Sequence, residues 1–302
     1  MQIVSKLTKF RYAFLLMLLI ALIFVFVAFQ LRSETSLQSS FSLLAFSVST
    51  YGLIIMIGIA ICLFVMSQIR PDELDTLNVI EATVWTIIPA VVFSRAWHVI
   101  TDFHLYKDNL GEVINISSGG MSVWGALLGG LIGVYIFTLL YGFNFKLGLN
   151  TVSIVLPLGQ AVGRLGNLIN RELFGPPTDR PWGMFIEKAK RPAEYIDSEY
   201  FHPAFLYEII GLLILFIVLL GVSGLSQVKL GKTRGNKYHA WLKNSYIILG
   251  LYLLGYGLIR FFVEFYRIED DFVGFMSLNQ VVSLMFVAVG GLYLSNLFFR
   301  KS

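Results

Sequence analysis

The chain has 302 residues, of which 56% are hydrophobic and 14% charged, and its formal net charge is +4. Its mean hydropathy is +0.73. A chain this apolar is not an ordinary soluble domain, and its sparse charge excludes a nucleic-acid-binding surface, so the composition indicates an integral membrane protein. The single cysteine, Cys62, lies inside an apolar run, so no disulfide can form within the chain and we expect it to pack as a small apolar side chain.

Eight apolar runs are long enough for a membrane span, which needs about 20 residues as a helix. They cover residues 12–31, 41–66, 79–99, 123–142, 151–170, 203–222, 244–262 and 279–299. We therefore expect an all-α fold, a polytopic transmembrane helix bundle of about eight spans. The first run is too long for a signal peptide and no small-residue cleavage site follows it, so it is predicted to be an uncleaved anchor.

The distribution of basic residues predicts how these spans are oriented. Eight spans place both termini on one side, and the loop 223–243 carries five basic residues and no acid. The positive-inside rule therefore places this loop and both termini in the cytoplasm. The basic residues of segment 171–202 are matched by acids, and we expect this segment to form a small folded extracytoplasmic cap.

The domain organisation predicted from these spans is simple. The chain has no visible internal repeat, low-complexity tract or long linker. We expect an N-terminal helix and connector over residues 1–40, followed by one membrane domain over residues 41–302.

A polar stretch, Gly163-Arg-Leu-Gly-Asn-Leu-Ile-Asn-Arg-Glu-Leu-Phe-Gly175, closes the fifth run. On a helix Arg164, Asn167 and Arg171 would share one face, at i, i+3 and i+7. An unpaired arginine at membrane depth costs at least ~3 kcal/mol. A single arginine there has a structural explanation, namely that it joins helices, but a cluster of two Arg, two Asn and a Glu favours a site for an anionic headgroup.

Glycines recur along the same run. Gly159, Gly163 and Gly166 would leave its backbone thin enough for a neighbouring helix to pack closely. Gly125, Gly129 and Gly133 repeat at every fourth position in the fourth run and predict a second close-packing face.

A second polar stripe lies near the end of the seventh run. Tyr256, Arg260, Glu264 and Arg267 are spaced by four, four and three residues, so they fall on one helix face. A structural ion pair between Arg260 and Glu264 explains part of this stripe, but not the other two residues. Because a guanidinium binds phosphate oxygens in two-pronged fashion, we predict that Arg164 and Arg260 clamp a phosphate.

Two further groups of polar residues lie within apolar runs. Glu208 falls about one turn into the sixth run, where an unpaired carboxylate is costly, so we expect it to pair with an arginine of another helix. Arg95 and His98 share the third run with Glu81. They could line the cavity of the site, but we favour pairing with Glu208 or with each other. A lone histidine such as His98 is more often a packing residue than a catalyst.

These motifs resemble those of one family, the prolipoprotein diacylglyceryl transferases. The run from Gly163 to Gly175 is similar to the family signature Gly-Arg-x-Gly-Asn-x-x-Asn-x-Glu-x-x-Gly. Residues 202–208 resemble its His-Pro-x-x-Leu-Tyr-Glu block, and residues 256–267 its Tyr-Gly-x-x-Arg-Phe-x-x-Glu-x-x-Arg block. Tyr51-Gly52 resembles the Tyr-Gly of the family's first span, which makes the 12–31 helix an addition to a seven-span body.

The resemblance implies an enzyme of the bacterial cytoplasmic (inner) membrane. It would transfer a diacylglyceryl group from phosphatidylglycerol to the lipobox cysteine of a preprolipoprotein signal peptide and release glycerol 1-phosphate, with no cofactor, metal or nucleic acid. The catalytic residues are then expected to be Arg164, Glu172, Arg260 and Glu264. The expected lipid- and substrate-binding residues are Tyr51, Trp124, Asn167, Asn170, His202, Tyr207, Tyr256 and Arg267.

The sequence departs from the family pattern at Trp124, where many members carry a histidine. Tryptophan has only a donor N–H and cannot accept the thiol proton. The candidate bases are therefore Glu172 and Glu264, then His202. The same departure leaves a second function open, a diverged non-catalytic paralogue that binds anionic lipid or lipoprotein precursor. A transporter is a third reading, against which the missing internal repeat counts.

Overall fold

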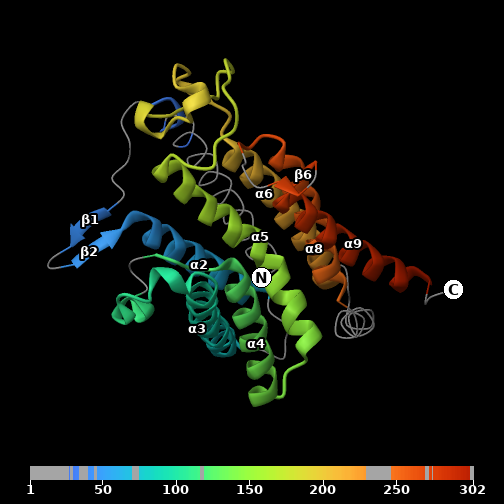
Figure 1. Cartoon of the computed structure of the whole chain (residues 1–302). Coiled ribbons are helices and arrows are strands. Elements are labelled where there is room, and N and C mark those ends of the chain that lie inside the picture. The colour runs from blue at the N-terminus through green and yellow to red at the C-terminus, as the bar shows by residue number, and fades with distance from the viewer. Residues whose placement is uncertain are drawn as a thin grey trace. The chain divides into compact units, whose positions relative to one another are not determined.

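The computed structural model describes residues 27, 30–33, 40–43, 46–69, 75–115, 119–228, 246–268, 272–273 and 275–299 (Figure 1). Within these residues, 7 helices are long and apolar enough to cross a membrane. They are α2 (Thr50–Ile69), α3 (Thr76–Thr101), α4 (Val123–Tyr141), α5 (Phe145–Asn170), α6 (Ala204–Val228), α8 (Ile247–Glu264) and α9 (Leu278–Phe299). The predicted all-α polytopic bundle is confirmed, and the predicted first span at 12–31 falls almost wholly outside the described residues.

The start of the second predicted span is wrong. Residues 41–43 and 46–49, expected as helix, belong to the paired strands β1 (Ser40–Leu43) and β2 (Phe46–Ser49), and the helix begins only at Thr50. The strands pair antiparallel, with Ser40 opposite Ser49 and Ser42 opposite Ser47. Serine alternates with apolar residues at both ends of this stretch, over residues 40–43 and 46–49, and a period of two is the pattern of a strand rather than a helix.

The fifth predicted span begins earlier than position 151. Helix α5 starts at Phe145, because the side chain of Asn144 accepts a hydrogen bond of 3.0 Å from the backbone N–H of Leu147, as an N-cap residue does. Helix α4 ends at Gly142, whose φ of 64° is the left-handed conformation that closes many helices. Most of the expected loop 143–150 is therefore helical.

The chain forms two compact units whose borders cut across the helices. The first unit comprises Met1–Gly58, Gln160–Leu213 and Gly257–Met285, and the second comprises Ile59–Gly159, Ile214–Tyr256 and Phe286–Ser302.

In the second unit, α3 and α4 pack along their lengths (Figure 1). The predicted glycine face of α4 is confirmed, since a Cβ added at Gly125, Gly129 or Gly133 would collide with backbone carbonyls of α3. The carbonyl beside Gly133 belongs to Trp85, and it lacks its usual helical donor because the residue four positions later is Pro89. Glycine is thus required where the two backbones touch.

The predicted pairing of Arg95 and His98 is wrong. The guanidinium of Arg95 is buried and donates to five backbone carbonyls, those of Glu112, Val113, Asn115, Gly119 and Gly120. Nδ1 of His98 lies 3.0 Å from Asp102 Oδ2 instead. Arg95 therefore organises the connection between α3 and α4, a role that its position in an apolar run does not reveal.

In the first unit, segment 171–202 folds into a small structure beside the start of α6. Its strands β3 (Met184–Phe185) and β4 (Tyr200–Phe201) pair antiparallel, and Met184, Ile186 and Phe201 are fully buried. The predicted folded segment therefore has a core of its own. A second short hairpin, β5 (Phe272–Val273) with β6 (Met276–Ser277), leads into α9.

Candidate functional site

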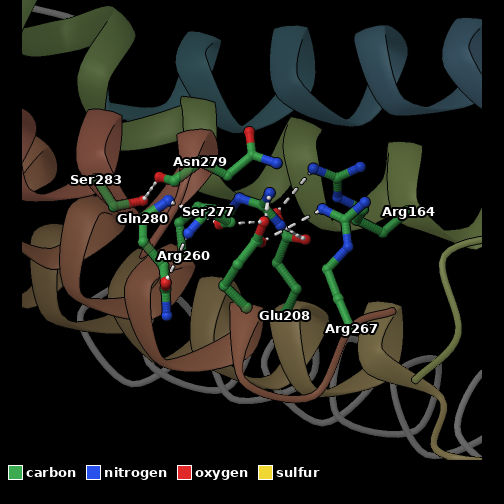
Figure 2. Close-up of polar contacts among 9 residues, drawn as sticks. Arg164, Glu208, Arg260, Arg267, Ser277, Asn279, Gln280 and Ser283 are labelled. Carbon is green, nitrogen blue, oxygen red and sulfur yellow. Dashed lines mark hydrogen bonds and ion pairs between the residues drawn. The ribbon is translucent and has the colours of Figure 1, made fainter. Parts of the chain in front are cut away.

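Five charged side chains of the first unit form one alternating chain of ion pairs (Figure 2). Glu208 accepts from Arg164 Nη2 at 2.9 Å and from Arg260 Nη1 at 3.3 Å. Arg260 continues through Nη2 to Glu264 Oε2 at 3.0 Å, and Arg267 Nη1 reaches the same oxygen at 3.5 Å. We call these five residues the arginine–glutamate network. Three guanidiniums against two carboxylates leave it with one excess positive charge.

The network is buried in its middle and is most exposed at its Arg164 end. The side chains of Glu208 and Glu264 are 2% and 1% exposed and that of Arg260 is 9% exposed, whereas Arg164 is 28% and Arg267 13% exposed. Buried charges persist only where partners and hydrogen bonds compensate their lost hydration. The prediction that Glu208 pairs with an arginine of another helix is confirmed, and it pairs with two.

Helix ends bring these residues together. Arg164 lies in the last two turns of α5, Glu208 in the second turn of α6, and Arg260 and Glu264 in the last turns of α8. Because consecutive helices run in opposite directions, the end of one and the start of the next meet at the same level. Two predicted clamps that are far apart in sequence thus share one carboxylate.

Ser277 connects the network to α9 and was missed by the sequence reasoning. Its hydroxyl donates to Glu264 Oε1 at 3.1 Å and accepts from the backbone N–H of Gln280 at 3.2 Å, while Gln280 Oε1 accepts from the backbone N–H of Ser277 (Figure 2). This reciprocal arrangement is a capping box. The pattern Ser-x-x-Gln before an apolar run was the available signal.

The end of the polar stretch is not helical, although the predicted shared face required a helix up to Arg171. Helix α5 ends at Asn170. Arg171 and Leu173 have φ values of 53° and 56°, in the left-handed region that side chains other than glycine rarely adopt. Arg171 therefore leaves the face of Arg164 and donates to the carbonyls of Phe185 and Ser33. Its role here is to hold the segment that follows the helix.

This turn positions Glu172 against two asparagines. Glu172 Oε1 accepts from Asn167 Nδ2 at 2.8 Å and from Asn170 Nδ2 at 3.2 Å. The backbone N–H of Glu172 donates to the carbonyl of Asn167 at 3.1 Å, which reverses the chain at the helix end. Arg171 and Leu173, on both sides of Glu172, have strained backbone conformations that cost stability. Such residues cluster at functional sites, where the strain holds a side chain in one position.

The glycines of the polar stretch mostly make close contacts. A Cβ added at Gly166 would collide with the ring of Tyr51, and one at Gly175 would collide with the backbone carbonyl of Tyr266. The predicted close packing is therefore confirmed at Gly166. A Cβ at Gly163, in contrast, would meet nothing within 4 Å. Tyr51, predicted to bind substrate, rests on the backbone of α5 one turn from Asn170.

His202 and Tyr207 belong to an aromatic group with Trp182 and Tyr266. Tyr207 Oη accepts from Trp182 Nε1 at 2.9 Å and lies 2.7 Å from His202 Nδ1. The rings of Tyr207 and Tyr266 meet edge to face at 5.3 Å. Burial lowers the pKa of His202 below its ordinary value, and the charge of Arg180 lowers it further, so His202 is neutral at pH 7.

Two predicted site residues belong to the second unit. Trp124 lies at the start of α4 with 50% of its surface exposed. The ring of Tyr256 stacks on that of Tyr252 at 5.7 Å and lies 6.1 Å from Phe286. Their predicted roles in substrate binding stay predictions.

The two glutamates predicted as bases have different surroundings. Glu264 is buried and engaged by Arg260, Arg267 and Ser277. Glu172 is exposed, and among the described residues its second oxygen, Oε2, has no hydrogen-bond partner. Glu172 therefore has an oxygen available to accept a proton, and Glu264 has the surroundings of a structural ion-pair partner.

Comparison with known proteins places these features in a family. The sequence model described as prolipoprotein diacylglyceryl transferase matches residues 38–295. A phosphatidylglycerol–prolipoprotein diacylglyceryl transferase of Thermosynechococcus vestitus is 32% identical over 251 residues, which are 83% of this chain and 88% of the relative. Proteins of the same name from Acaryochloris marina and Finegoldia magna are 35% and 30% identical, over 78% and 83% of this chain and 78% and 92% of their own lengths. The chain belongs to the prolipoprotein diacylglyceryl transferase family.

Proposed function

We propose that this protein transfers the diacylglyceryl group of phosphatidylglycerol to the thiol of the lipobox cysteine in a preprolipoprotein. The observation that carries this proposal is the pair of guanidiniums, Arg164 and Arg260, held on the single carboxylate of Glu208. The names of the relatives reported above supply the lipid and the acceptor. The excess positive charge of the arginine–glutamate network suits a phosphate monoanion.

The reaction is a displacement at a glycerol carbon. The thiolate sulfur forms a bond to the terminal carbon of the diacylglycerol, the bond from that carbon to the phosphate oxygen breaks, and glycerol 1-phosphate departs with the electron pair. Negative charge therefore grows on the phosphate in the transition state. Arg164 and Arg260 stabilise that charge more than the ground state, and this difference is what accelerates the reaction.

Thiolate, not thiol, is the nucleophile, so the cysteine must lose a proton. Glu172 takes this role in our proposal, because its Oε2 is available while Glu264 is occupied by two arginines and a serine. Asn167 and Asn170 fix the carboxylate of Glu172 by donating to its other oxygen. Arg267 anchors Glu264, and through it the position of Arg260.

The site lies at the extracytoplasmic surface of the cytoplasmic membrane in this proposal. Segment 171–202 follows the network directly, and the basic loop 223–243 lies at the other end of α6. The positive-inside rule assigns that loop to the cytoplasm. Lipobox cysteines of exported precursors emerge on the opposite side, where the network would meet them.

The test is incubation of the purified protein with phosphatidylglycerol and a lipobox peptide. The proposal predicts one glycerol phosphate released per peptide modified, and a peptide mass increased by one diacylglyceryl group. A protein that binds the lipid but produces neither product would support the non-catalytic paralogue, for which Trp124 is the best argument.

A pair of variants tests the assignment of the base. Glu172→Gln is expected to lower kcat by about 10²-fold or more, the usual contribution of a general base, with an unchanged melting temperature. Glu264→Gln is expected to lower the melting temperature, because it removes a buried partner of two arginines. Full activity of Glu172→Gln would exclude Glu172 as the base.

A further inference from the structure

Asn167 carries a buried acceptor that its protein partners do not use. The residue is 6% exposed, and among the described residues its Oδ1 has no hydrogen-bond partner. The orientation of the amide is fixed, because its NH₂ group donates to the carboxylate of Glu172 at 2.8 Å. A flipped amide would set two oxygens against each other. Oδ1 therefore points away from Glu172 as an acceptor.

A buried acceptor without a donor costs stability, and in a functional site the donor is commonly supplied by a ligand. The position of Asn167 restricts which ligand atom that is. Asn167 follows Arg164 by three residues on α5, about 4.5 Å along the helix axis, toward the end that leads into segment 171–202. This is the side on which the headgroup of a lipid extends beyond its phosphate.

We propose that Asn167 Oδ1 accepts a hydrogen bond from a hydroxyl of the headgroup glycerol and thereby selects phosphatidylglycerol among anionic lipids. The inference rests on the proposed function, in which Arg164 binds the phosphate of the same lipid. The headgroup glycerol carries two hydroxyls within a few bonds of the phosphate, so a donor can reach an acceptor one helical turn from the phosphate site. A lipid without these hydroxyls leaves Oδ1 buried and unpaired.

The same helix offers a matched control. Gln160 lies on the same side of α5 as Arg164, one turn before it, and its Oε1 is also buried without a hydrogen-bond partner among the described residues. Along the helix axis, Gln160 precedes Arg164 whereas Asn167 follows it, so Gln160 lies farther from the helix end toward which the headgroup extends. Loss of the Gln160 amide is therefore expected to leave headgroup selection unchanged, although both substitutions remove a buried amide oxygen.

The experiment compares phosphatidylglycerol with phosphatidylpropanol, in which both headgroup hydroxyls are replaced by hydrogen. The two lipids have the same charge and nearly the same size. We expect the wild-type kcat/KM to be at least about 10-fold higher for phosphatidylglycerol, the cost of leaving a buried acceptor unpaired. In Asn167→Ala the ratio should fall to about 2-fold or less, and in Gln160→Ala it should stay at the wild-type value.

Several results would overturn this inference. One is a wild-type protein whose kcat/KM is about equal for phosphatidylglycerol and phosphatidylpropanol. Another is an Asn167→Ala protein that keeps the wild-type ratio of these two values. A changed KM for the peptide with an unchanged lipid ratio would instead assign Oδ1 to a peptide N–H.

The proposal stays testable if Asn167→Ala does not fold. The two singly deoxygenated headgroups then decide it on the wild-type protein, where removal of one hydroxyl should reproduce most of the ratio and equal rates for all lipids would contradict it. Failure of the proposed function is a separate result, namely no transfer from phosphatidylglycerol at all.

Discussion

At the scale of single residues, the carboxylate of Glu208 links helix α5 to helix α8 through ion pairs with Arg164 and Arg260. It accepts from Arg164 and Arg260 while only 2% of its side chain is exposed. Neither arginine could be placed so close to the other without it, because two unscreened positive charges repel each other. The pair is thereby preorganised for an anion rather than assembled by it.

Glu208→Gln is therefore expected to destabilise the protein. The amide keeps the size of the side chain but removes the negative charge that Arg164 and Arg260 share, and breaking a buried pair costs roughly 3–5 kcal/mol. We expect a clear drop in melting temperature in detergent. The exposed Glu194 gives the control, since Glu194→Gln should melt as the wild type does. Equal melting temperatures for both variants would show that the bridge does not stabilise the fold.

The lowered pKa of His202 predicts how stability depends on pH. Folding lowers this pKa, so the unfolded chain binds a proton first as the pH falls below about 6.5. The contribution of His202 to stability is complete above that pH and is lost below it. The melting temperature should fall between pH 7 and pH 5, and by less in His202→Gln. An identical decrease in both proteins would exclude this contribution.

Residue types within the site were predictable, and their partners were less so. Apolar surroundings required that Glu208 be paired, and the structure provides the pairing. Helical spacing suggested that Arg171 would face the same way as Arg164, but the left-handed turn at Arg171 redirects it. A sequence pattern gives the periodicity of a helix. It does not show at which residue a left-handed backbone conformation ends that helix. The predicted catalytic roles stay predictions.

At the scale of elements, the packing of α4 against α3 depends on the absence of side chains. A Cβ at Gly129 would collide with the carbonyl oxygen of Pro89 and lie 2.6 Å from its carbonyl carbon. A Cβ at the neighbouring Gly130 would meet only Thr86 and Ala90, at 3.8 and 4.0 Å. The packing therefore requires glycine at position 129 but leaves room for a Cβ at position 130.

Gly129→Ala and Gly130→Ala form a matched pair for this contact. Gly129→Ala should destabilise the protein by about 1–3 kcal/mol, because the helices must move apart. Gly130→Ala should be neutral or slightly stabilising, since alanine is the better helix former. Thermal unfolding of both proteins measures the difference. The same melting temperature for the two variants would contradict the close contact.

The helices themselves were largely predictable, and their ends were not. Length and hydropathy suffice to find an apolar helix, so every described membrane-length helix overlaps a predicted span. Hydropathy does not distinguish a strand from a helix, so the hairpin at 40–49 was missed. Arg95 was expected to find a charged partner and instead binds backbone carbonyls, whose positions no side-chain pattern shows.

At the scale of the whole molecule, the orientation in the membrane follows from basic residues that lie in loops. Alternation of the described helices places the ends of α5 and α8 on the same side as the starts of α6 and α9. The sequence assigns this side to the outside. The assignment and the additional N-terminal span remain predictions of the sequence.

Cysteine labelling tests the orientation. In a Cys62→Ser background, Ala193→Cys in segment 171–202 should react with a membrane-impermeant maleimide added to intact spheroplasts, because Ala193 is exposed. Asn236→Cys, in the basic loop, should react only after the membrane is opened. Labelling of Asn236→Cys in intact spheroplasts, with Ala193→Cys protected, would reverse the orientation.

The central claim, that Arg164 and Arg260 act together on one lipid phosphate, is tested most directly by a double-mutant cycle. Arg164→Lys, Arg260→Lys and the double variant are compared with the wild type by kcat/KM for phosphatidylglycerol, well below the melting temperature of all four proteins. Groups that act as a unit are not additive, so each single variant should lose nearly as much activity as the double variant. Losses that simply multiply, or single variants of full activity, would contradict a shared phosphate.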